Sequence, residues 1–124
     1  MLTEFDNVRQ IPGEPRRRLF SSNYFHLYVW YDEAGAFCGF QLCYDISGNE
    51  RALSLIKGKF VHAGIDGGEF SPRSNMTPIL VRDGSFQHAA VLERFKNEAL
   101  GLEDDIRDYV IEKIEEYSRQ HGAL

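Results

Sequence analysis

Residues 24–45, which read YFHLYVWYDEAGAFCGFQLCYD, constrain the fold more than any other stretch of the chain. Two runs rich in aromatic and branched side chains flank residues 32–35, where Gly35 can adopt the left-handed backbone that short hairpin loops often need. Side chains alternate between the two faces of a strand. The segment is therefore typical of a β-hairpin with a four-residue loop.

The alternation in both runs also predicts how the two strands pair. Closing the loop with Tyr31 opposite Ala36 places Leu27 opposite Phe40 and gathers the apolar side chains on one face. A shift of one residue would send half of these side chains to the other face. The predicted apolar face carries Phe25, Leu27, Val29, Cys38, Phe40 and Leu42.

Three more strands are predicted after the hairpin, at residues 51–56, 60–66 and 78–81. Two helices are predicted between residues 85 and 121, where apolar residues recur at helical spacing. The expected inward stripes are Phe86, Ala89, Leu92, Phe95 and Ala99 in the first helix and Ile106, Tyr109, Val110, Ile114 and Tyr117 in the second. Strands followed by helices predict an α+β fold, an antiparallel β-meander of about five strands with both C-terminal helices packed on one sheet face.

The turn between the third and fourth of these strands can be drawn in two ways. A three-residue turn at 57–59 places Val61 and Ala63 on the apolar face, whereas a two-residue turn places Phe60 and His62 there. We favour the three-residue turn because Val61, Ala63 and Ile65 alternate cleanly.

Residues 1–18 end in PGEPRRR, and two prolines with a glycine disfavour a regular helix or central strand. We expect an ordered N-terminal arm there, after a short edge strand near residues 4–8. The antiparallel sheet would follow over residues 19–82 and the helices over 85–121. A length of 124 residues suits a single domain of this kind.

Composition excludes several classes of protein. Asp and Glu number 19 against 14 Lys and Arg, a net charge of −5, which argues against a general nucleic-acid binder. No apolar run approaches the roughly 18 residues of a membrane-spanning helix, and the N-terminus lacks the pattern of a signal peptide. These features predict a cytoplasmic protein without a membrane partner.

The two cysteines, Cys38 and Cys43, are expected on opposite faces of one strand and therefore reduced.

Four phrases, PGEPRRRLF, VWYDEAG, GFQLCYD and NMTPILVRDG, resemble a group of small uncharacterised bacterial proteins. The resemblance would cover nearly the whole chain, and GFQLCYD is its most distinctive phrase. It implies one complete domain, and it implies no activity, substrate or cofactor, because none is established for that group.

The second sheet face carries the candidate site. In the predicted register, one row across the strands reads His26, Gln41, Ser54 and His62, all of them polar. A neighbouring row reads Tyr28, Gly39, Ile56 and Phe60, and a third reads Tyr24, Cys43, Ala52 and Gly64. The face thus combines hydrogen-bonding groups with aromatic rings. Gly39 leaves a bare backbone position on which the Tyr28 ring could lie.

The residues in these rows do not form the pattern of a metal site or a catalytic site. His26 and His62 would lie three strands apart, about 14 Å at about 4.8 Å per strand, too far to share a zinc ion without further ligands. Cys43 and His26 are the only Cys–His pair the register allows, and a buried cysteine is more often a small apolar side chain than a nucleophile. We therefore expect no cofactor, no metal and no catalytic residue.

Two hypotheses for function remain, and they belong to different classes. In the first, the chain is a non-enzymatic binding domain that uses Tyr24, Tyr28, Trp30, Phe37 and Phe60 and pairs as a homodimer, unless the arm or residues 67–77 cover this face. In the second, His26, Gln41 and His62 meet a small anionic ligand or substrate held by Arg16, Arg17 and Arg18, since guanidinium groups match anions. Single-stranded nucleic acid stacked on the rings is a weaker third hypothesis.

Gln41 tests the assignment of faces. It lies mid-strand in an otherwise apolar phrase, and a buried amide must be hydrogen-bonded. We predict that it is mostly buried and bonded to His26, Ser54 or a covering segment.

Overall fold

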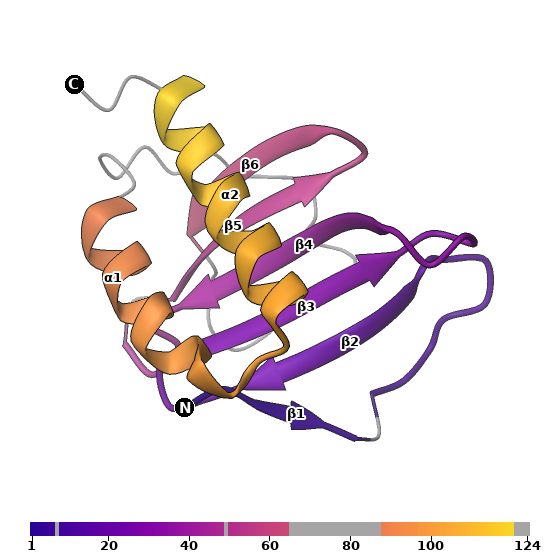
Figure 1. Cartoon of the computed structure of the whole chain (residues 1–124), viewed down its shortest axis with the longest axis horizontal. Coiled ribbons are helices and arrows are strands. Elements are labelled where there is room, and N and C mark those ends of the chain that lie inside the picture. Colours follow the sequence, from indigo (N-terminus) through magenta and orange to yellow (C-terminus); the bar gives the residue numbers. More distant parts are fainter. Residues whose placement is uncertain (7, 49, 65–87, 121–124) are drawn as a thin grey trace.

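A computed structural model describes residues 1–6, 8–48, 50–64 and 88–120, and every structural statement below refers to these residues. Six antiparallel strands form one sheet in chain order, and two helices follow them (Figure 1). The strands are β1 (Thr3–Phe5), β2 (Arg16–Ser21), β3 (Phe25–Tyr31), β4 (Phe37–Tyr44), β5 (Arg51–Ile56) and β6 (Lys59–Gly64). The helices are α1 (His88–Glu98) and α2 (Asp104–Gln120), joined through a short 3₁₀ turn at Ala99–Gly101.

The predicted α+β fold with a meander and C-terminal helices is confirmed. Both helices cross the same face of the sheet, with α1 beside α2 (Figure 1). A short edge strand was expected near residues 4–8 and is β1, at Thr3–Phe5, whereas residues 16–18, predicted as part of the arm, form the first half of β2.

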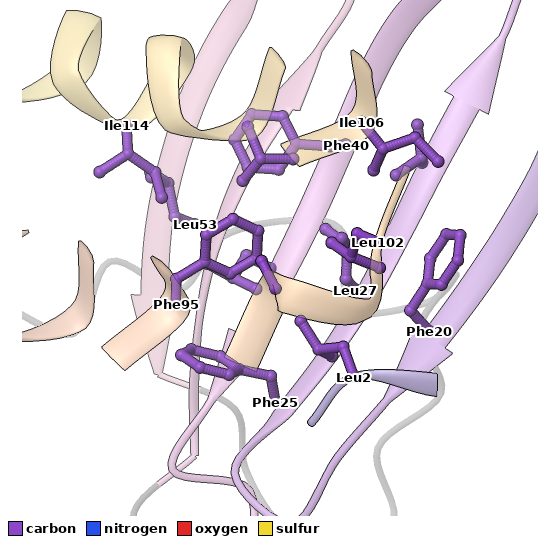
Figure 2. Packing of buried hydrophobic residues seen from close by; sticks show 14 of the residues in the cluster. Leu2, Phe20, Phe25, Leu27, Phe40, Leu53, Phe95, Leu102, Ile106 and Ile114 are labelled. Carbon is purple, nitrogen blue, oxygen red and sulfur yellow. The ribbon is translucent and has the colours of Figure 1, made fainter. Parts of the chain in front are cut away.

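The core lies between this sheet face and the helices. Phe25, Leu27 and Phe40 from the hairpin are fully buried against side chains such as Phe95 and Ile114 of the helices (Figure 2). Each such side chain contributes about 1.5–3 kcal/mol to folding through apolar burial. Phe25, Leu27, Val29, Phe40 and Leu42 share this face, which confirms the predicted apolar face for these five residues.

One detail of the inward helix stripes is corrected. In α1, Val91 is buried and Ala89 is exposed, so the stripe runs through Val91, Phe95 and Ala99. In α2, Ile106, Val110 and Ile114 are buried as predicted.

The hairpin register differs from the predicted one by two residues. Val29 pairs with Phe40 and Leu27 with Leu42, and a β-bulge near Tyr31 absorbs the extra residue, Cys38. An even shift leaves residues 39–44 on their predicted faces, because side chains alternate with a period of two, whereas Phe37, beyond the bulge, moves to the face that carries the helices. The pairing partners change all the same, so Trp30 and not Tyr28 lies opposite Gly39.

The turn between β5 and β6 has two residues, so the three-residue turn is wrong. Lys57 and Gly58 both have positive φ, 51° and 78°, as in the tight turns that match the twist of paired strands. Leu53 therefore pairs with His62 and Leu55 with Phe60. As a result, Phe60 and His62 belong to the helix side of the sheet.

Several expectations concern residues outside the described part of the chain. They are the strand at 78–81, the loop at 67–77, the end of the strand at 65–66 and the start of the first helix at 85–87. Within the described part, no helix is both long and apolar enough to span a membrane.

Candidate functional site

The face of the sheet turned away from the helices is called the distal face below. Residues that pair directly across strands share a face, so the pairings of the six strands define its members. They are Thr3, Phe5, Arg17, Leu19, Ser21, His26, Tyr28, Trp30, Gly39, Gln41, Cys43, Ala52, Ser54, Ile56, Lys59, Val61 and Ala63. Gln41, Cys43, Ala52 and Ser54 are buried, whereas Tyr28 and Trp30 are half-buried.

Tyr28 and Trp30 form the aromatic part of this face. Their rings are stacked, with centroids 6.2 Å apart and an interplanar angle of 15°. Trp30 lies over Gly39, where a Cβ would meet the indole Cε3 at 3.6 Å and would collide with the carbonyl oxygen of Leu55. Gly39 thus lets the indole and strand β5 both approach strand β4 closely.

Arg17 adds a cation to the aromatic pair. Its guanidinium carbon lies 5.5 Å from the centroid of the Tyr28 ring, and its Nε donates to the carbonyl oxygen of Arg9 at 2.7 Å. The side-chain amide of Gln10 pairs with the backbone N–H and C=O of Arg17, which covers the edge of β2 beyond the end of β1. Arg17 is therefore held in place beside the rings.

The three other aromatic residues predicted for this face lie on the helix side. Phe37 stacks on Tyr109 of α2 with centroids 4.4 Å apart, because the bulge turns it toward the helices. Phe60 packs edge-on against Tyr117 at 5.4 Å.

Tyr24 precedes β3, and the guanidinium of Arg94 on α1 lies 3.9 Å from its ring centroid. The predicted five-ring surface is thus reduced to Tyr28 and Trp30.

A polar cluster lies farther along the distal face. Gln41 is 7% exposed, which confirms its predicted burial and its predicted face. Its Nε2 donates to Cys43 Sγ at 3.3 Å, so its partner is the thiol two residues along the strand and not His26 or Ser54. His26 pairs with Cys43 across the strands, and the carboxyl of Glu50 interacts with both side chains.

The electrostatics of this cluster keep the thiol protonated. Burial raises the pKa of Cys43 to about 12, and the nearby Glu50 acts in the same direction while the Gln41 amide opposes it. Burial also raises the pKa of Glu50, and the charge on His26 offsets part of this rise. A thiol with such a pKa carries almost no thiolate at neutral pH and is a poor nucleophile.

His62 is not part of this cluster, which corrects the predicted row of His26, Gln41, Ser54 and His62. The His62 Nε2 lies 2.6 Å from the Tyr44 hydroxyl on the helix side, and the two rings are stacked. His26 on β3 and His62 on β6 thus lie three strands apart and on opposite faces of the sheet. Gln41 and Ser54 do pair, as predicted.

The three arginines do not converge on one anion site. Arg18 points to the helix side, where its guanidinium binds Glu4 at 2.7 Å and Glu103 at 2.9 Å and also contacts the Tyr31 hydroxyl. Arg17 lies on the distal face, and Arg16 is exposed at the start of β2. Alternation along a strand separates neighbouring side chains in this way, and β2 had not been predicted as a strand from Arg16 onward.

Two contributions to the distal face were missed in the sequence. Leu19 and the 52%-exposed Phe5 extend the row through Tyr28, and they follow from the alternation in β1 and β2. Glu50 was interpreted only as a turn residue, and nothing in its local pattern indicates a contact with His26.

Among the described residues, no three His, Cys, Asp or Glu side chains gather as metal ligands.

Comparisons with known proteins add no relative: the chain matches no protein-family model, no curated protein and no solved structure.

Proposed function

We propose that this chain is a non-enzymatic binding domain and that the distal face is its binding surface. The observation that carries the proposal is the stacked, half-exposed pair Tyr28 and Trp30, held over Gly39 beside Arg17. Tyrosine, tryptophan and arginine are enriched at protein interfaces, where they bury large areas with few rotatable bonds. A surface already ordered before binding loses less conformational entropy on association. We also propose, from the sequence alone, that the domain acts in the cytoplasm.

The chemistry of the polar cluster favours binding over catalysis. A nucleophile needs a base that can take its proton, and the protonated Cys43 thiol beside an acidic Glu50 is the reverse of an activated pair. Of the cluster, the half-buried His26 and Glu50 supply hydrogen-bonding groups on the distal face.

The alternative function, a site for a small anionic ligand, is not supported with the residues that were predicted for it. It requires His26, Gln41 and His62 to meet Arg16, Arg17 and Arg18, yet His62 and Arg18 lie on the helix side, where Arg18 is already paired with two carboxylates. Of that set, only His26, Gln41 and Arg17 share the distal face.

Self-association through the distal face is a prediction of this proposal that can be tested separately. Sedimentation velocity across the micromolar range would show a dimer, and Trp30→Ala would return it to a monomer if Trp30 lies in the interface. Leu100→Ser is the matched control, because Leu100 is 71% exposed and belongs to the turn between the helices.

Selection from a displayed library of short peptides tests the binding function directly. We expect selected peptides to bind the wild type and Leu100→Ser with equal affinity and to lose at least about tenfold against Trp30→Ala, as for a central aromatic contact. Selected peptides that bind Trp30→Ala equally well would place the binding surface elsewhere. Failure to select any peptide, together with a monomer in sedimentation, would overturn the proposal.

A further inference from the structure

We propose that one end of the distal face binds an acidic peptide segment that carries an apolar side chain. This inference deepens the proposed binding function by naming the chemistry of the partner. The residues concerned form one row across five strands, Arg17, Trp30, Gly39, Ile56 and Lys59, and the row is called the cationic row below.

The cationic row follows directly from the strand register. Arg17 pairs with Trp30, Trp30 with Gly39, Gly39 with Ile56, and Ile56 with Lys59. The row therefore reads cation, aromatic ring, bare backbone, aliphatic side chain, cation. Neighbouring strands lie about 4.8 Å apart, so the two cations start about 19 Å apart at the backbone, the span of roughly six residues of extended peptide.

The ends and the middle of the cationic row match different side chains of an acidic peptide that carries an apolar residue. The half-buried Trp30 and Ile56 offer apolar area to a leucine-like side chain, and the Trp30 indole lies over Gly39 between them. Lys59 is exposed, and Arg17 uses its Nε for Arg9 while its other N–H groups remain to reach a carboxylate. Both ends of the row can thus bind a carboxylate while its middle buries an apolar group.

The charge of the row contrasts with the charge of the chain. The whole chain has a net charge of −5, yet the charged members of the distal face are Arg17 and Lys59. Glu50 lies toward the opposite end of the strands, beside His26 and Cys43. Acidic side chains gather instead on α2, which crosses the helix side of the sheet. A partner attracted to this face should therefore be anionic.

The row also discriminates between occupants. Two copies paired face to face with the two-fold axis on this row would place cations opposite cations, so self-association through the distal face has to leave the cationic row at the margin of the contact. Single-stranded nucleic acid would stack on Trp30, but its affinity is built from many phosphate contacts, and this row offers two cations. A short acidic segment needs no more than two.

Fluorescence provides the test, because Trp30 is the only tryptophan in the chain. The probe is a blocked hexapeptide with glutamate at positions one, three, four and six and leucine at two and five. Three comparison ligands are the same peptide with lysine for glutamate, the same peptide with serine for glutamate, and an oligothymidylate. We expect the glutamate peptide to change the Trp30 emission with saturation, to bind more weakly as salt is added, and to bind more tightly than all three.

Charge reversal completes the experiment. Lys59→Glu should weaken binding of the glutamate peptide by roughly fivefold or more, since an attraction of surface strength becomes a repulsion. Lys96→Glu is the matched control, with the same change in net charge on α1, and it should leave the affinity unchanged. Equal binding of the serine peptide, tighter binding of the oligothymidylate, or no effect of Lys59→Glu would overturn the inference while leaving the binding function standing. If none of the four ligands perturbs Trp30 and library selection also fails, the proposed function itself fails.

Discussion

The Gln41 amide donates a hydrogen bond to the Cys43 thiol at 3.3 Å, and both side chains are buried on the distal face. A buried amide on this face therefore has its partner within the same strand. Strand β4 thus packs against the helices with one face and holds this buried polar contact on the other.

Gln41→Leu should affect binding more than folding. The substitution removes a weak bond to sulfur and adds apolar burial, so we expect the free energy of unfolding to change by less than about 1 kcal/mol. Peptides selected against the wild type should bind more weakly, because Gln41 lies directly beside Tyr28 in the register. Urea unfolding and peptide titration measure the two effects. A loss of several kcal/mol without any loss of affinity would make Gln41 a purely structural residue.

Cys43 should make stability fall at alkaline pH. Its pKa is raised from 9.0 to about 12 by burial, so the folded state holds the proton more tightly than the unfolded state. The protonated Cys43 thiol therefore contributes its full stabilisation below pH 9, and this contribution is lost as the pH rises toward 12. Cys43→Ala should flatten the decline by up to about 1.4 kcal/mol per pH unit in that range. Identical slopes for the two proteins would contradict the assigned burial of the thiol.

Arg18 should stabilise the fold through its ion pairs. Its guanidinium is 20% exposed and joins Glu4 of β1 to Glu103 before α2. Arg18→Met keeps much of the apolar contact with Phe20 and should cost about 1–3 kcal/mol. Arg107→Met, which removes exposed pairs on α2, is the control and should cost little.

The pH dependence of this difference has a defined sign. The hydrogen bond from Arg18 lowers the pKa of Glu4 below 4.5, so the stability it provides is present at neutral pH and is lost as the pH falls through the lowered value. The difference between wild type and Arg18→Met should therefore shrink below about pH 4.5. A difference that stays constant into more acidic solution would rule out the carboxylates as its source.

Gly39→Ala should disturb the aromatic pair and the sheet together. The new methyl group would collide with the carbonyl oxygen of Leu55, and the strand movement that relieves this collision would shift the Trp30 indole, which lies 3.6 Å from the methyl position. Overpacking of this kind typically costs about 1–3 kcal/mol. Thermal unfolding gives the loss in stability, and a shift of Trp30 emission in the folded protein reports the displaced ring. A variant with unchanged stability and emission would show that the indole does not rest on Gly39.

The class of fold and the apolar face of the hairpin could be predicted because both depend on the period of side-chain alternation. Partners across the strands could not be predicted, because the bulge near Tyr31 shifts the pairing by two residues while residues 39–44 keep their faces and only Phe37 changes face. The length of the turn at Lys57 and Gly58 was more difficult to predict. A two-residue turn and a three-residue turn both place apolar residues on the helix side, and the two-residue turn that forms requires a lysine at positive φ.

Part of the site was predictable for the same reason. Tyr28, Trp30 and Gln41 were placed on the correct face by alternation alone. Phe37, Phe60 and His62 were not, because their faces depend on the bulge and on the turn. The contact of Glu50 with His26 and Cys43 depends on tertiary packing that no local pattern encodes.

Side-chain NMR of the protein with a library-selected peptide tests directly the proposal that the distal face binds partners. Methyl groups distinguish the two faces even within one strand, since Ile56 lies on the distal face and Leu55 on the helix side. We expect the peptide to shift the methyl signals of Leu19 and Ile56 and the indole N–H of Trp30, and to leave Leu55 and Ile114 in place. Shifts confined to Leu55, Ile114 and other residues of the helix side would contradict the account.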